Sequence, residues 1–192
     1  LVIGAEVLSP FIDWQDRSTC VLFGDGAGAA VLVPTSQKGR GLVATYLGSD
    51  GTLADILKIP AGGSALPPSL ETVRARMHTV KMMGAEVFKI AVRTMSDAFL
   101  KVTEKAGLDP NEIDCVIPHQ ANLRIIQAMA ERLNLPLEKI FVNLDRYGNM
   151  SAASTPVALY EAIKSGRIQP GSKVVIVAFG SGLTWAACVV KW

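Results

Sequence analysis

The sequence has little excess of charge of either sign and no long apolar run. Its 192 residues include 19 lysines and arginines against 17 aspartates and glutamates, for a formal charge of +2. A field of the size that attracts nucleic acid is therefore excluded, and a charged partner has to meet a local patch. Apolar runs such as VVIVAF at 174–179 are much shorter than the roughly 20 residues of a membrane span. With 49% hydrophobic residues, the chain is long enough to bury a sizeable core.

Cysteine is scarce, with Cys20, Cys115 and Cys188 the only three. Each stands in a strand-like apolar run, and none forms a CxxC or other metal-ligand spacing. Buried, reduced core cysteines are therefore expected, with no metal site and a reducing compartment such as the cytoplasm, or the plastid stroma in a plant or alga.

A polar lead-in is also absent. The chain opens on LVIGAEVL (1–8), without an initiator Met or a basic leader. A strand this apolar normally has neighbours on both sides in a sheet. The expectation is that the chain begins in the middle of a fold, which a preceding segment or another chain completes.

What is present is an alternation of strand and helix patterns, which favours a layered α/β fold with largely buried strands. Helical periodicity is found at about 80–106, 120–134 and 155–165, with Gly107 as the expected C-cap of the first helix. The apolar, β-rich runs lie at 1–8, 20–23, 28–33, 42–47, 114–117, 173–179 and 185–191. The stretch 48–78 has turn residues and little periodicity, which indicates a lid or a subunit-contact loop.

Two glycine turns resemble each other. VLFGDGAGAAVLV (21–33) and VAFGSGLTWAACVV (177–190) both contain a strand, Phe-Gly-x-Gly and a second strand. The likeness suggests a duplicated architecture, although two glycine turns can also be similar by chance. Because no helix follows GDGAGAA, the pattern does not favour a nucleotide-binding loop, and its glycines are expected to permit positive φ and close backbone approach. Taken alone, FGSG (179–182) favours an ordinary turn, whereas read together with His119 its backbone N–H groups are suited to one half of an oxyanion hole.

Two polar positions interrupt the apolar pattern. His119, one of two histidines, follows an apolar strand in VIPHQANLRII (116–126), and Asn149 stands in a glycine turn in RYGNMSAASTP (146–156). Taken alone, each favours a structural reading, as a packing histidine and a turn asparagine. Together they are candidates for a pair of neutral hydrogen-bond donors.

The motifs GDGAGAAVL, SDGTLADIL, MMGAEVFKIAV, VIPHQANLRII, LDRYGNMSAAS and AFGSGLTWAA occur in this order over nearly the whole chain. The sequence thereby resembles the β-ketoacyl-acyl-carrier-protein synthase III family of condensing enzymes. The resemblance implies a thiolase-like, layered α-β-α-β-α fold, of which this chain is the C-terminal part. Residues 1–40 would end the N-terminal half of that fold, and 41–192 would form the C-terminal half.

The resemblance also implies an activity: decarboxylative Claisen condensation of a short acyl-CoA, such as acetyl-CoA, with malonyl-acyl carrier protein. His119 and Asn149 match the histidine and asparagine of the family's Cys-His-Asn site, and the backbone N–H of Ser181 matches an oxyanion donor. Some members have glycine at position 181. The nucleophilic cysteine matches none of the three cysteines and is expected outside this chain, and no cofactor is implied beyond the coenzyme A thioester substrate.

Binding positions are implied in the same way. Arg17 would lie near the adenine end of coenzyme A, and Lys89 and Arg124 would face the acyl carrier protein. A homodimer is also implied. The pantetheine channel would be lined by Gly84, Phe88, Ala121 and Asn122.

Related condensing enzymes differ from this sequence in their site motifs. An elongating ketoacyl synthase would have a second histidine at Asn149, a thiolase would have a cysteine in the C-terminal glycine turn, and a plant-type polyketide synthase would have GFGPG there. None of these patterns is present. A non-catalytic dimerisation or carrier-protein-binding module stays open at this point, because the nucleophile is missing.

Overall fold

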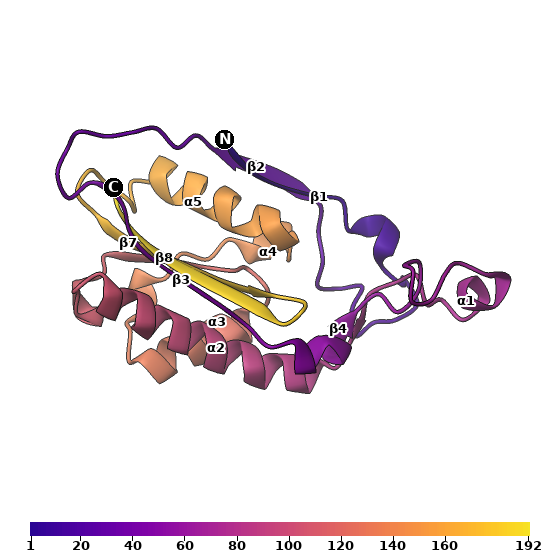
Figure 1. The fold of residues 1–192 in the computed structure, drawn as a ribbon. Coiled ribbons are helices and arrows are strands. Elements are labelled where there is room, and N and C mark those ends of the chain that lie inside the picture. Colours follow the sequence, from indigo (N-terminus) through magenta and orange to yellow (C-terminus); the bar gives the residue numbers. More distant parts are fainter.

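The computed structural model describes all residues, 1–192, and has a mixed α/β architecture (Figure 1). Its strands are β1 (Val2–Glu6), β2 (Gly26–Ala30), β3 (Gly41–Ser49), β4 (Leu57–Lys58), β5 (Lys81–Met82), β6 (Cys115–Pro118), β7 (Lys173–Gly180) and β8 (Thr184–Lys191). Its helices are α1 (Leu70–Arg74), α2 (Gly84–Lys105), α3 (Leu123–Leu133), α4 (Leu144–Tyr147) and α5 (Ser154–Lys164). No helix combines the length and the apolar character that crossing a membrane requires.

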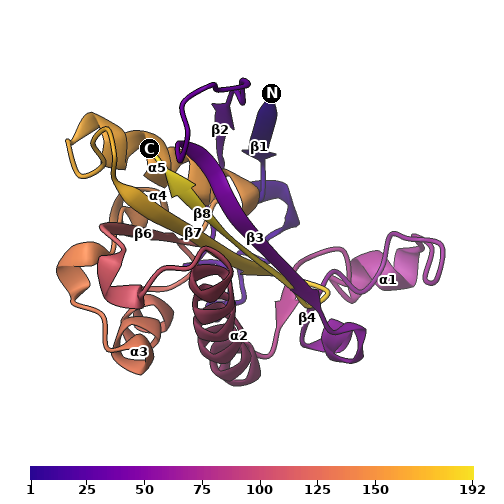
Figure 2. The same cartoon turned by 60° about the vertical axis from the view of Figure 1, so that its left-hand side comes forward.

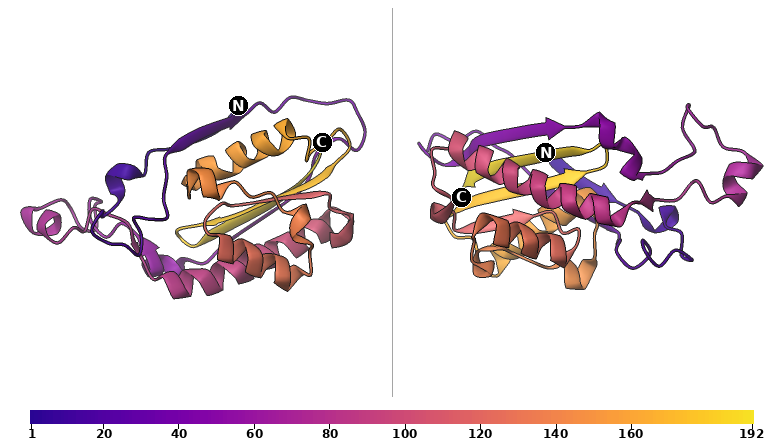
Figure 3. Two further views of the ribbon diagram at one scale, coloured as in Figure 1. Left: turned by 180° about the vertical axis from the view of Figure 1, so that it is seen from behind. Right: turned by 90° about the horizontal axis from the view of Figure 1, so that it is seen from below.

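A four-stranded sheet in the order β3-β8-β7-β6 forms the centre. β6 and β7 are parallel, whereas β7 with β8 and β8 with β3 are antiparallel. Helices α2 and α3 cover one face and α5 covers the other (Figures 2 and 3). Both faces of the central strands are therefore covered, with β6 buried throughout and β7 combining buried and half-buried residues, which explains why both read as nearly continuous apolar runs.

The main core lies between α2 and the sheet. Ala91, Met95 and Phe99 follow one another at intervals of four on the inner face of α2 and are fully buried. They belong to one cluster with Val175 and Val189 of the sheet. This is the apolar stripe that the helical periodicity predicts.

A two-stranded ribbon, β1 paired with β2, lies over the outer side of α5 (Figures 1 and 2). Its glycines permit the approach, because a Cβ on Gly4 would stand 2.2 Å from the Ala152 carbonyl oxygen, and one on Gly28 would stand 2.9 Å from Pro156 Cβ. The layers therefore run α2/α3, sheet, α5, ribbon. The ribbon lies within 1–40 and the sheet within 41–192, and their assignment to two halves of a larger fold stays a prediction.

Residues 59–80 project from the body and contain α1 (Figure 1). The Phe11 carbonyl accepts the Val80 N–H at 2.8 Å, and Asp13 lies 3.3 Å from Arg76 and 3.5 Å from Lys81. The irregular sequence of this stretch predicts its loop character, but the short α1, capped reciprocally by Ser69 and Thr72, is an addition. Its role as a lid or a subunit contact stays a prediction.

Some predicted elements are wrong. Residues 20–23 form turns, with one isolated bridge at Phe23, so Cys20 does not stand in a strand. The predicted strand 28–33 is instead Gly26–Ala30. The first long helix begins at Gly84 rather than near Val80, because residues 81–82 pair with β4. The two similar glycine turns differ in the structure. The turn at 179–182 joins β7 and β8 as a hairpin, whereas β2, which follows the earlier turn, pairs with β1.

Candidate active site

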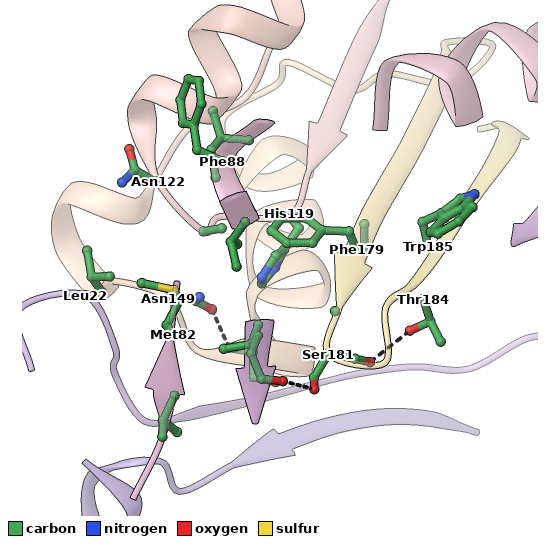
Figure 4. Close-up of a pocket in the computed structure, with 18 of the residues that line it drawn as sticks. Leu22, Met82, Phe88, His119, Asn122, Asn149, Phe179, Ser181, Thr184 and Trp185 are labelled. Atoms are coloured by element: carbon green, nitrogen blue, oxygen red, sulfur yellow. Dashed lines mark hydrogen bonds between the residues drawn. The ribbon is translucent and has the colours of Figure 1, made fainter. Parts of the chain in front are cut away.

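One large cavity of about 1420 Å³ opens where the ends of the central strands meet the starts of α2 and α3 (Figure 4). The turn between β7 and β8, the short β4, and the Asn149 segment form the other walls. Eight of the ten residues assigned from the sequence line this cavity: His119, Asn149, Ser181, Gly84, Phe88, Ala121, Asn122 and Arg124.

His119 is positioned by the end of β6. The Pro118 position pairs with Val177, and the His119 N–H donates to the Val177 carbonyl at 2.7 Å, so the ladder continues past the proline. The ring lies edge-on to Phe179, with the ring centroids 5.7 Å apart, and only 8% of the residue is exposed. Burial lowers the pKa of His119 to about 4. The imidazole is therefore neutral at pH 7, with one N–H donor.

Asn149 is held by its backbone and by one side-chain contact. Its N–H donates to the Leu22 carbonyl at 2.8 Å, and its carbonyl accepts the Gly24 N–H at 2.9 Å. Its Oδ1 accepts the Ser151 N–H at 2.9 Å (Figure 4). That contact fixes the orientation of the amide and leaves its NH₂ group without a protein acceptor on the cavity wall.

Two glycines bring these segments together. Gly148 has φ of +67°, and a Cβ there would stand 3.0 Å from the Leu22 carbonyl oxygen. A Cβ on Gly24 would stand 2.1 Å from the Tyr147 carbonyl oxygen. None of the glycines within 24–28 has positive φ. Of the two reasons for glycine that the sequence allows in that loop, only close backbone approach holds.

Ser181 lies in the turn between β7 and β8. Its hydroxyl donates to the Leu57 carbonyl (Figure 4), and its backbone N–H has no protein acceptor. The neighbouring Leu183 exchanges two backbone hydrogen bonds with Asp50, at 2.8 and 2.9 Å. The turn is thus anchored on both β4 and the end of β3.

The remaining sequence-assigned residues separate into two groups. Asn122 is the N-cap of α3, with its Oδ1 accepting the Arg124 N–H at 2.8 Å, and both side chains border the cavity beside Phe88. Arg17 and Lys89 do not line the cavity. Lys89 pairs with Glu86 at 3.1 Å on the exposed side of α2, and Arg17 is exposed in the turns after β1.

None of the three cysteines lines the cavity. Burial raises the pKa of the Cys115 thiol to about 11 and also raises that of Cys188. Both are protonated at neutral pH and lack the environment of a nucleophilic thiolate.

Three residues that shape the site are not among those predicted from the sequence. Phe179 packs on His119, and Trp185 lines the cavity with its indole so close to Gly48 that a Cβ there would stand 2.2 Å from Nε1. Gln120 is fully buried, and its side chain joins the end of β6 to the segment 141–143 by hydrogen bonds to the Phe141 carbonyl and the Asn143 N–H. Its signal was a polar residue next to His119 within an apolar run, where buried polar groups need partners.

The layered α/β fold, with a buried histidine and an asparagine amide on the walls of one cavity, places the chain in the thiolase-like class of folds. The family model for 3-oxoacyl-(acyl-carrier-protein) synthase III matches residues 1–51, and the model for its C-terminal part matches residues 103–192. The chain belongs to this family.

Curated relatives and solved structures support the same family assignment. The β-ketoacyl-(acyl-carrier-protein) synthase III of Clostridioides difficile is 57% identical over all 192 residues, which cover 58% of that protein. The crystal structures of the synthases from Thermus thermophilus and Aquifex aeolicus are 52% and 47% identical, with TM-scores of 0.89 and 0.88 over the whole of this chain. They are covered over 58% and 57% of their own lengths. The chain thus spans somewhat more than half the length of the relatives it matches.

Proposed function

We propose that these residues form the decarboxylation half of an active site that condenses a short acyl group with malonyl-acyl carrier protein. The observation that carries the proposal is the pairing of a neutral His119 with an Asn149 whose amide NH₂ is unoccupied, on the walls of one cavity. Family membership supplies the reaction class.

Neutral donors suit this chemistry. When the bond between the malonyl carboxylate carbon and Cα breaks, CO₂ leaves and the electron pair moves into an enolate whose charge rests on the thioester oxygen. Hydrogen bonds from His119 and Asn149 to that oxygen are strongest in the transition state, where the charge develops. A charged imidazolium is a far stronger acid than the neutral ring and would protonate the enolate carbon that has to attack, so the low pKa of His119 preserves the nucleophile.

The acyl acceptor is proposed to be a cysteine outside these 192 residues, because Cys115 and Cys188 have raised pKa values and none of the three cysteines lines the cavity. The enolate carbon attacks the acyl thioester on that cysteine, the new C–C bond forms, and the thiolate leaves. The backbone N–H of Ser181, which has no protein acceptor, is suited to stabilise the tetrahedral oxyanion.

The substrates follow from the same proposal. Coenzyme A thioester and malonyl-acyl carrier protein would enter past Gly84, Phe88, Ala121 and Asn122, with Arg17 near the adenine end of coenzyme A. Lys89 and Arg124 lie on neighbouring helices and would offer positive charge to the carrier protein. No cofactor beyond the thioester is proposed, and the assembly is proposed to be a cytoplasmic homodimer.

Single substitutions in the full-length protein test the assignment. His119→Ala and Asn149→Ala should each lower the rate of malonyl-acyl carrier protein decarboxylation about 100-fold or more, measured as CO₂ release. His78→Ala is the matched control, since His78 is the only other histidine and does not line the cavity. Unchanged decarboxylation in both site variants would overturn the proposal and favour a non-catalytic carrier-binding module.

A further inference from the structure

A single carboxylate on α5 binds three side chains from the segment that precedes Asn149. Glu161 accepts Asn143 Nδ2 at 2.7 Å, Arg146 Nη2 at 2.6 Å and the Tyr147 hydroxyl at 2.6 Å. Its side chain is 18% exposed. Partial burial by itself would raise the pKa of Glu161, but the hydrogen bonds from Tyr147 and Asn143 and the charge of Arg146 hold that pKa below its usual range. The carboxylate is therefore ionised at neutral pH.

The segment bound by Glu161 has little stability of its own. α4 is a single turn, Leu144–Tyr147, with no side-chain cap, and an isolated turn of helix is unfavourable in water. Gly148 follows it directly, and Asn149 comes next. The placement of the Asn149 amide thus depends on what holds this turn, and Glu161 is the charged group that does so.

The same network reaches His119. Gln120, the next residue after His119, is fully buried and accepts the Asn143 N–H at 3.0 Å on its Oε1. Its Nε2 donates to the carbonyls of Pro118, at 2.9 Å, and Phe141, at 3.1 Å. A continuous chain of contacts therefore runs from β6 through Gln120 and Asn143 to Glu161.

Asn143 shows that this network is not arranged for stability alone. It is 1% exposed, and its Oδ1 is buried without a hydrogen-bond partner. An unsatisfied buried acceptor costs about 1–3 kcal/mol. The contacts that Asn143 does make are those that join Gln120 to Glu161.

We propose that Glu161 is a positioning residue for the condensation reaction, fixing the Asn149 amide relative to His119 through the hydrogen-bonded chain of Asn143 and Gln120 on one side and Tyr147 on the other. This inference rests on the proposed function of the two donors. Glu161 does not line the active-site cavity, so it acts through the residues it holds. Small displacements of paired donors weaken transition-state stabilisation far more than substrate binding.

The test compares two half-reactions in the full-length protein. Glu161→Gln should lower the rate constant for malonyl-acyl carrier protein decarboxylation about tenfold, with less than a twofold change in KM. Acylation of the enzyme by labelled acetyl-CoA, which does not use the His119–Asn149 pair in the proposed mechanism, should change less than twofold. Equal losses in both half-reactions, or a lower Tm with an unchanged decarboxylation rate, would overturn the inference.

Glu112→Gln is the matched control. Glu112 is also a hydrogen-bonded carboxylate, with two donors rather than three: Lys173 Nζ at 2.7 Å and the Asp109 N–H at 2.9 Å, and it does not line the cavity. This variant should leave both half-reactions within twofold of the wild type. If it slows decarboxylation as much as Glu161→Gln does, the effect of Glu161 is general destabilisation and the inference fails.

A double-mutant comparison separates this inference from the proposed function. If Glu161 acts through Asn149, adding Glu161→Gln to Asn149→Ala should cost less than a further twofold in decarboxylation. A full tenfold additional loss would contradict the positioning role while leaving the proposed function intact. Wild-type decarboxylation in the His119→Ala and Asn149→Ala variants would instead overturn the proposed function, and this inference with it.

Discussion

The rings of His119 and Phe179 meet edge to face, with their centroids 5.7 Å apart and their planes inclined at 72°. The two residues stand near the ends of the parallel strands β6 and β7, so the contact follows from the sheet register that pairs Pro118 with Val177. Phe179 is 9% exposed and His119 is 8% exposed. The phenyl ring is thus part of the apolar wall that keeps the imidazole neutral.

Removing that wall should change the titration of the histidine. Phe179→Ala is expected to admit water to the imidazole and move the pKa of His119 upward from about 4 toward its unperturbed value of about 6.5. The lost ring should also lower the free energy of unfolding by about 3 kcal/mol. NMR titration of the His119 ring protons measures the pKa. A value still near 4 in the folded variant would show that Phe179 is not the cause.

The buried histidine also predicts a pH dependence of stability. In the unfolded chain His119 binds a proton near pH 6.5, but in the folded chain its pKa is about 4 because the ring is buried. As the pH falls from 6.5 to 4, the unfolded state gains a proton that the folded state does not, so stability is full above pH 6.5 and declines toward pH 4. The decline attributable to His119 is at most about 3 kcal/mol.

Denaturant unfolding at several pH values checks this expectation. His119→Asn should abolish the part of the decline between pH 6.5 and 4 that the histidine causes, and His78→Asn should leave it in place. Equal slopes in the wild type and the His119→Asn variant would contradict a neutral buried imidazole.

Gly148 should be more sensitive to substitution than its backbone angle alone requires. Gly148 and Gly107 have nearly equal positive φ, +67° and +66°. An added Cβ on Gly148 meets the Leu22 carbonyl oxygen at 3.0 Å, whereas nothing lies within 4 Å of one on Gly107. Alanine at either site costs about 1 kcal/mol or more in backbone strain, and the cost is larger at Gly148, because its ψ of −163° combined with positive φ is a conformation that essentially only glycine adopts. Only Gly148→Ala should also displace Asn149 and lower the decarboxylation rate by about tenfold or more.

The comparison is made at matched folded fraction, with Tm and decarboxylation rate measured for both variants. Gly107→Ala, at the C-terminus of α2, should lose stability and keep its rate within twofold. Should Gly148→Ala also keep its rate, the close approach between Gly148 and the segment 22–24 has no part in placing the amide.

Parts of this molecule with strong local signals could be predicted from the sequence. The apolar periodicity within 80–106 predicts the buried face of α2, and the apolar run at 173–179 predicts β7. The role proposed for His119 comes from the family motif, since a lone histidine after an apolar strand favours packing. That it is buried and close to Phe179 is a property of the sheet register, which local pattern does not determine.

Other parts depended on contacts between distant segments. Residues 20–23 are apolar enough for a strand, yet the Leu22 and Gly24 backbone groups bond to Asn149 rather than to a neighbouring strand. The helical pattern extends back to Val80, but the N–H of Val80 bonds to Phe11 and residues 81–82 pair with β4. Tertiary hydrogen bonds override local preference at both places, and no single-sequence pattern encodes such partners.

Ser181 offers a test that separates a backbone donor from a side-chain anchor. Its hydroxyl donates to the Leu57 carbonyl, while its own N–H has no protein acceptor. Ser181→Ala removes the anchor and keeps the N–H, so the rate of condensation should stay within about threefold and the Tm should fall slightly, by the value of one exposed hydrogen bond. Ser181→Pro removes the N–H and should lower the condensation rate about 100-fold or more, as the loss of an oxyanion donor does.

Pre-steady-state acylation and steady-state condensation, measured together with Tm, distinguish the two effects. Thr184→Ala is the control for a disturbed turn, because its hydroxyl contacts the Ser181 carbonyl at 3.5 Å and no backbone donor is lost. The oxyanion role requires that the proline variant be far slower than both alanine variants. If Ser181→Ala lowers the condensation rate as much as Ser181→Pro does, the backbone N–H is not the important group. The rate would then depend on the shape of the turn, which the hydrogen bond from the Ser181 hydroxyl to the Leu57 carbonyl maintains.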